Sequence, residues 1–124
     1  MKFYLIIGSV FTFAGILASS LSSHAFKDIL FLNASYESFV LAQNLLTFHG
    51  LAIMLLAYLA HQLKLNLLNY ANIGIMLGIF LFAVSIFIKS LTGSFPLGFL
   101  TPLGGAVMML GWILAIISFV TIKK

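Results

Sequence analysis

Residues 68–90 read LNYANIGIMLGIFLFAVSIFIKS, and the fold class follows from this stretch. It contains no Asp, Glu or Arg, and its single lysine, Lys89, lies next to its end. The hydrocarbon core of a bilayer is about 30 Å thick and is crossed by about 20 apolar residues in a helix. Because no water is present there to bond exposed backbone groups, such a run has to be helical. Residues 68–90 therefore predict a membrane-spanning helix.

Three further apolar stretches of similar length, without a central charge, are predicted at residues 3–21, 39–60 and 100–122. None shows the alternation that is typical of a membrane β-barrel. The four spans predict an all-α integral membrane fold, an antiparallel four-transmembrane-helix bundle in one membrane domain, residues 1–124. Composition agrees, because 63% of the residues are hydrophobic and only 6% are charged. Soluble domains carry about 25% charged residues, so soluble and disordered classes are excluded.

The chain has six lysines, no arginine and no cysteine. Isolated lysines between apolar runs are typical of membrane-end anchors, and they form no basic stripe for a nucleic acid. Four spans place both termini and the 61–67 link on one side, which carries Lys2, Lys64, Lys123 and Lys124. The other side carries only Lys27 and Lys89. The positive-inside rule then predicts a bacterial cytoplasmic (inner) membrane protein with both termini in the cytoplasm.

The longest link, residues 22–38, contains a short amphipathic segment. Phe26, Ile29 and Leu30 would lie on one side of a helix, with Lys27 and Asp28 towards the other. This pattern predicts a short interfacial helix after the first span, and a plain surface linker is the alternative. Small residues around His24 also resemble a signal-peptide cleavage site, but the length of the 3–21 run favours an uncleaved span.

Each span carries a stripe of small or polar residues at steps of three and four. Lipid tails are as apolar as leucine, so membrane helices associate through close backbone approach at such residues. In the second span the stripe is Gln43, Thr47, Gly50, Met54 and Ala57. The residues predicted to pack in the other spans are Gly8, Thr12, Gly15, Ser19, Gly74, Gly78, Gly104, Gly105, Gly111 and Ala115.

His49 lies near the middle of the second span, where an ionisable side chain is a functional-site hypothesis by default. The alternative is a neutral imidazole bonded to a group on a neighbouring helix, and both interpretations stay open. Trp112 is interpreted as a packing residue, and Thr101 is expected to cap the fourth helix ahead of Pro102. The candidate lining of a polar cavity is His24, Gln43, Asn44, Thr47, His49, Ser85 and Thr101.

Motifs that carry chemistry are absent from the sequence. It contains no HExxH, no GxSxG, no phosphate-binding glycine loop before a lysine, and no paired carboxylates within a span. The histidines at 24, 49 and 61 lack the spacing of metal ligands. We therefore expect no catalytic or metal-binding residues and no cofactor.

Four motifs carry a family resemblance: FHGLAI (48–53), LFAVSIF (81–87), TPLGG (101–105) and GW (111–112). With this order and spacing, the chain resembles the small four-span membrane family of unknown function that includes bacterial YgdD. The resemblance covers nearly the whole chain. It implies four spans and a membrane location, and it implies no activity.

These observations favour a non-enzymatic membrane protein that associates with the lipid bilayer, with itself as a homo-oligomer, or with a larger membrane complex. A small transporter or channel subunit with a polar cavity around His49 is the first alternative. A membrane-embedded lipid-modifying enzyme, with His24 or His49 as a general base, is the second.

Overall fold

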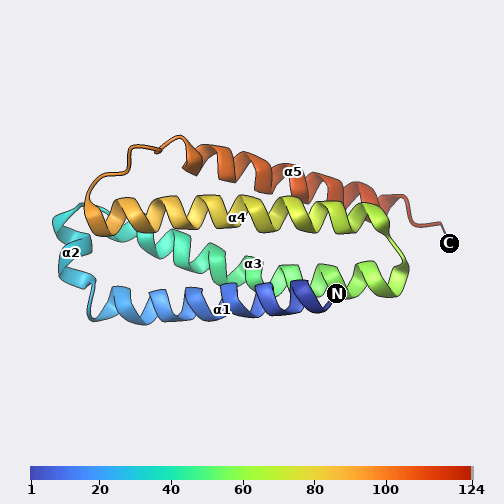
Figure 1. Ribbon diagram of the computed structural model, residues 1–124, viewed down its shortest axis with the longest axis horizontal. Helices are drawn as coiled ribbons and strands as arrows, with labels where there is room; N and C mark the ends of the chain where they lie inside the picture. Colours follow the sequence, from blue (N-terminus) through green and yellow to red (C-terminus); the bar gives the residue numbers. More distant parts are fainter. Residues whose placement is uncertain (124) are drawn as a thin grey trace.

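The computed structural model describes residues 1–123, so Lys124, one of the lysines behind the topology prediction, lies outside the described residues. Residues 1–123 form five helices and no strand, which confirms the all-α fold (Figure 1). The helices are α1 (Lys2–Ser23), α2 (Lys27–Leu32), α3 (Tyr36–Leu63), α4 (Asn66–Thr92) and α5 (Leu100–Val120).

Four of these helices are long and apolar enough to cross a membrane, as predicted. The shortest, α5, has 21 residues and is therefore about 31 Å long at a rise of about 1.5 Å per residue. α3 and α4 extend beyond the expected spans because the turn between them is tight. Lys64 adopts a left-handed conformation with φ 53° and ends α3, and α4 begins two residues later. α5 ends at Val120, two residues earlier than expected.

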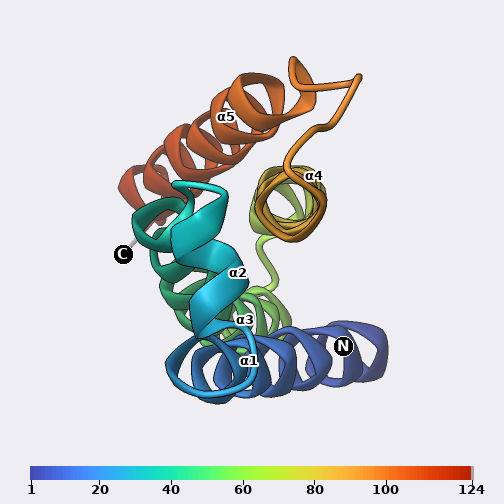
Figure 2. The same cartoon turned by 90° about the vertical axis from the view of Figure 1, so that its left-hand side faces the viewer.

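The long helices pack in chain order, α1 on α3, α3 on α4 and α4 on α5, each antiparallel to its neighbour. α1 and α5 form the two edges of the array and do not approach each other (Figure 2). Both described chain ends lie near the α3–α4 turn, whereas α2 and the 93–99 link lie at the opposite end (Figure 1). The molecule therefore has a terminal end and a link end.

A short helix follows the first span, as predicted, but it buries a narrower face than the amphipathic pattern suggested. α2 has six residues, and Leu30 is its one buried side chain. Leu30 belongs to a small cluster with Ala18 and Phe39, whereas Ile29 and Phe31 are exposed. Six residues make less than two turns, so one residue can point directly inwards. Its interfacial position stays a prediction.

Glycines bring the backbones of α1 and α3 close together. A Cβ atom added at Gly8 would lie 2.5 Å from the carbonyl oxygen of Gly50. One added at Gly15 would lie 2.8 Å from the carbonyl oxygen of Gln43. Thr12 lies between them, with its hydroxyl 3.5 Å from the carbonyl oxygen of Thr47. No larger side chain fits at either glycine without moving the helices apart.

The α4–α5 pair uses the same device. A Cβ atom at Gly78 would lie 2.7 Å from the carbonyl oxygen of Gly104, and one at Gly111 would lie 2.7 Å from the backbone nitrogen of Ile75. Gly74 is less crowded, with 3.3 Å to the Cα of Gly111. Gly105 is different, because its added Cβ would make only ordinary contact, 3.8 Å from the Phe82 ring.

The central α3–α4 pair packs through larger side chains. Its fully buried members include Ile53, Leu68, Ile75 and Ile79, which belong to the main core cluster. Ala115 of α5, also fully buried, packs into the same cluster. The core therefore sits in the middle of the array, and glycine contacts join α1 and α5 to it.

Candidate functional site

His49 is buried on α3 and both of its ring nitrogens are engaged. Its Nδ1 lies 2.8 Å from the carbonyl oxygen of Leu45, and the indole Nε1–H of Trp112 donates to its Nε2 over 3.1 Å. An indole N–H can only donate, so Nε2 must be the acceptor and Nδ1 must carry the proton. The contacts therefore specify a neutral imidazole that links α3 to α5.

The structure gives Trp112 a role that the sequence analysis missed, because its ring is both a packing element and a hydrogen-bond donor. The sequence did contain a feature that could have predicted this hydrogen bond. A tryptophan in an apolar span keeps one N–H group that needs an acceptor, and acceptor side chains are few in these spans.

Gln43 and Thr47 lie at the α1–α3 contact. The Ser22 hydroxyl donates to Oε1 of Gln43 over 2.9 Å, and both residues are buried. The Thr47 hydroxyl donates back to the carbonyl oxygen of Gln43 over 2.9 Å. Ser19 is half-buried nearby, and its carbonyl oxygen accepts from Ser22. These side chains are bonded to protein groups and join the two helices.

His24 and Asn44 line a different feature, a shallow groove of about 660 Å³ along the outside of α1 and α3. Both side chains are exposed. Thr47 is the third of the predicted residues in this groove, whose other lining residues are Ile16, Ser19, Ser20, Ser23, Phe48 and Leu51.

Ser85 and Thr101 meet at the link end, where their hydroxyl oxygens are 2.6 Å apart and join α4 to α5. The expected cap of the fourth helix is therefore wrong. α5 begins at Leu100 without a side-chain cap, because the Thr101 hydroxyl is bonded to Ser85 instead. Both residues line a cavity of about 500 Å³ between the start of α3, the end of α4 and the start of α5.

The seven candidate residues therefore do not share one cavity. His24 and Asn44 line the outer groove with Thr47, which also bonds Gln43 at the α1–α3 contact. His49 is bonded between α3 and α5, and Ser85 and Thr101 line the link-end cavity.

Three polar residues organise the link end through contacts that were not predicted, since the 33–35 stretch had suggested only a cap for the second spanning helix. The Asn33 Nδ2 donates to the carbonyl oxygen of Ser90 over 2.8 Å, and the Ser35 hydroxyl donates to the same oxygen over 3.2 Å. The last carbonyl groups of a helix lack partners within the helix, so the end of α4 attracts these donors. Ser35 accordingly precedes α3 without a side-chain cap bond.

Asn72 is a further buried polar residue that the sequence analysis did not single out. It is fully buried on α4, and its Nδ2 donates to the carbonyl oxygen of Ile53 over 3.0 Å. Its Oδ1 has no partner among residues 1–123. An amide within an apolar span was the available signal.

Within residues 1–123, no group of three or more His, Asp or Glu side chains could hold a metal ion. Four apolar helices with polar groups bonded between them define a small multi-span α-helical membrane protein. Residues 18–105 match the family described as "Protein of unknown function (DUF423)", and the chain belongs to this family.

Several relatives of the chain are described as UPF0382 membrane proteins. The chain is 29% identical to the UPF0382 membrane protein SH2409 of Staphylococcus haemolyticus, over 95% of each chain. It is also 29% identical to the UPF0382 membrane protein SAB0533 of Staphylococcus aureus, again over 95% of each. The UPF0382 membrane protein YwdK of Bacillus subtilis is 34% identical over 59% of this chain and 60% of its own. No solved structure matches the chain.

Proposed function

We propose that this membrane protein is a non-enzymatic component that acts by association, with lipid, with further copies of itself or with a larger membrane complex. One observation carries the proposal. His49, near the middle of α3, has both nitrogens bonded to protein groups, so the imidazole is committed to holding α3 and α5 together. The bonded pair Ser22 and Gln43 supports the same interpretation at the α1–α3 contact.

The proposal predicts a particle that retains partners when it is extracted gently. Native mass spectrometry in a mild detergent should find stable oligomers, a co-purifying membrane protein or retained lipid. A strictly monomeric particle without lipid and without a partner would contradict the proposal.

A flux experiment separates this role from transport. Proteoliposomes with the wild-type chain should show no more proton or ion flux than empty liposomes. His61→Ala is the matched control for His49→Ala, because His61 lies on the same helix and is exposed. A wild-type flux that His49→Ala abolishes and His61→Ala preserves would establish the transporter alternative instead.

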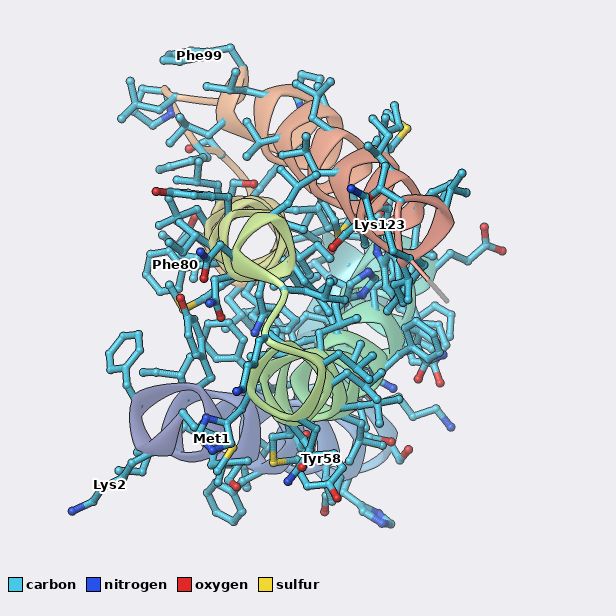
Figure 3. All side chains as sticks on the ribbon, turned by 90° about the vertical axis from the view of Figure 1, so that its right-hand side faces the viewer. Met1, Lys2, Tyr58, Phe80, Phe99 and Lys123 are labelled. Atoms are coloured by element: carbon cyan, nitrogen blue, oxygen red, sulfur yellow. The ribbon has the colours of Figure 1, made fainter. Side chains whose placement is uncertain are left out.

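The proposal places the protein in the bacterial cytoplasmic membrane with both termini in the cytoplasm, and it keeps the YgdD-type resemblance. Lys2 and Lys123 lie at the terminal end (Figure 3), and Lys64 lies in the adjacent turn. The link end carries only two lysines, Lys27 and Lys89. This asymmetry supports a cytoplasmic terminal end.

The cysteine-free chain makes the orientation directly testable. In intact cells, a membrane-impermeant maleimide should label Ser94→Cys in the 93–99 link and spare Gln62→Cys near the α3–α4 turn. Permeabilised cells should label both variants, which controls for accessibility. The reverse pattern in intact cells would overturn the orientation.

A further inference from the structure

The link-end cavity has an amphipathic lining that is ordered along the helices. Leu41 lies about one turn further into α3 than Ser38, and Phe82 and Ile86 lie further into α4 than Lys89. The polar lining groups nearest the helix ends are Asn33, Ser35, Ser38, Lys89 and Ser90, joined by Ser85 and Thr101 from the α4–α5 contact. Polar groups thus gather towards the link end, and apolar side chains continue towards the middle of the spans.

The electrostatic character of this cavity favours an anion. Lys89 is its one charged lining residue, and none of the described lining residues is acidic. Both α3 and α5 begin beside the cavity without a side-chain cap, so the positive ends of two helix dipoles add to the lysine charge. Glu37 lines a neighbouring depression rather than this cavity.

The negative end of α4 also lies here, but two of its last carbonyl groups, those of the cavity-lining residues Lys89 and Ser90, are bonded. The carbonyl oxygen of Ser90 accepts from both Asn33 and Ser35, and that of Lys89 accepts from the backbone N–H of Gly93. Acceptors that are bonded in this way repel an incoming anion less than free carbonyl groups would. Lys89 is then the one full charge on the lining, and it favours an anion.

The Ser90 side chain gives a second, independent indication that the cavity binds a ligand. Ser90 lies one turn after Ile86 on the same α4 face, lines the cavity and is only 1% exposed. Its carbonyl oxygen is bonded, but no hydrogen bond of its hydroxyl is found among residues 1–123. The Ser90 hydroxyl therefore keeps a donor for an occupant of the cavity that this residue lines.

We infer that this cavity holds the phosphate-bearing headgroup of an anionic phospholipid, with Lys89 and the Ser90 hydroxyl on the phosphate and an acyl chain along Leu41, Phe82 and Ile86. The inference rests on the proposed function in its lipid-associated form and specifies the lipid. Phosphate chemistry alone would also suit a soluble phosphate, but the apolar part of the lining fits an acyl chain.

Native mass spectrometry of delipidated full-length protein tests the inference with three probes, phosphatidylglycerol, phosphatidylcholine and glycerol 3-phosphate. We expect wild-type protein to retain phosphatidylglycerol over phosphatidylcholine and to retain no glycerol 3-phosphate. Lys89→Gln should weaken phosphatidylglycerol retention by about tenfold, since a charge-assisted contact is lost. Lys27→Gln, at the same end but outside the cavity lining, is the matched control and should retain the lipid.

Two further variants test the same cavity without changing Lys89. Ser90→Ala should weaken retention by about threefold through loss of one hydrogen bond. Ser38→Trp should block the cavity and abolish the preference without changing any charge. Circular dichroism should show an unchanged helical content for each variant, so that lost retention is not lost folding.

Three results would overturn the inference. The first is that Lys27→Gln and Lys89→Gln weaken phosphatidylglycerol retention equally. The second is that phosphatidylglycerol and phosphatidylcholine are retained equally. The third is that glycerol 3-phosphate is retained as strongly as the lipid. If wild-type protein retains no lipid yet stays oligomeric, the headgroup site fails and the association proposal stands. If it retains neither lipid nor partner, both fail.

Discussion

The α1–α3 and α3–α4 contacts solve the same packing problem in different ways. Between α1 and α3, Gly8 and Gly15 let the backbones approach until no Cβ atom would fit. In the core cluster around α3 and α4, aliphatic side chains such as Ile53 and Ile79 fill the space and are fully buried. One side of α3 therefore depends on backbone approach and the other on side-chain volume.

The two contacts are stabilised by different physical effects. Burying an isoleucine gains little transfer free energy when the alternative surrounding is lipid, so the α3–α4 core is stabilised chiefly by close packing. The α1–α3 contact depends instead on the absence of a side chain at its glycines, which lets the two backbones approach. Adding atoms should therefore damage α1–α3 most, and removing atoms should damage α3–α4 most.

The largest expected effect is that of Gly15→Leu. The added side chain would overlap the Thr47 side chain and the backbone of Gln43, so α1 has to move away from α3. We expect a loss of more than about 3 kcal/mol in the free energy of unfolding, at the upper end for overpacking. Unfolding by denaturant in bicelles measures it.

Gly105→Ala is the matched control, because its Cβ would make only ordinary contact with Phe82. It should leave stability unchanged or raise it by up to about 1 kcal/mol through helix propensity. Similar losses for both variants would show that the glycines contribute through something other than close approach.

An intermediate effect is expected for Ile75→Ala in the core cluster, where Ile75 also lies against Gly111 of α5. Ile75 is fully buried, and its truncation leaves a void that the neighbouring helices fill only in part. We expect a loss of about 2 kcal/mol, near the lower end for such truncations in water, because the transfer term is smaller in lipid. The same bicelle unfolding experiment measures it.

Ile73→Ala sharpens this result, since Ile73 is on the same helix and is 38% exposed. Its truncation should change the free energy of unfolding by less than about 0.5 kcal/mol. If Ile73→Ala and Ile75→Ala cost the same, side-chain volume in the core cluster would not be what stabilises it.

The fold could be predicted from the sequence because long apolar runs without central charges leave a chain in lipid few options. The positions of the small-residue stripes could also be predicted from their spacing. The pairing of stripes could not, because glycine carries no chemical label for its partner. Only the structure shows that Gly8 faces Gly50 and that Gly78 faces Gly104.

The candidate site was less predictable, for a physical reason. His49 was visible as an ionisable residue at depth, but its partner, Trp112, is 63 positions away in sequence. The link end is held by a contact between Asn33 and Ser90, which are 57 positions apart. Helical periodicity orders residues within one helix and carries no information about contacts between helices.

Apart from the control variants, the smallest predicted effect concerns a third kind of contact, the hydrogen bond between α3 and α5. Trp112→Phe keeps the aromatic ring and removes the N–H group that bonds Nε2 of His49. Hydrogen bonds between membrane helices are worth about 0.6 kcal/mol on average and about 1.7 at most. A double-mutant cycle of Trp112→Phe with His49→Phe should give a coupling energy in this range, below the effects of Gly15→Leu and Ile75→Ala.

The same bond can be followed by fluorescence, because Trp112 is the only tryptophan in the chain. His49→Phe should change its emission through loss of the indole hydrogen bond. His61→Phe, the same change at an exposed position of α3, is the control and should leave the emission unchanged. A coupling energy near zero together with unchanged emission in His49→Phe would mean that the bond does not hold α5. The α4–α5 glycine contact would then be the main attachment of α5 to the array.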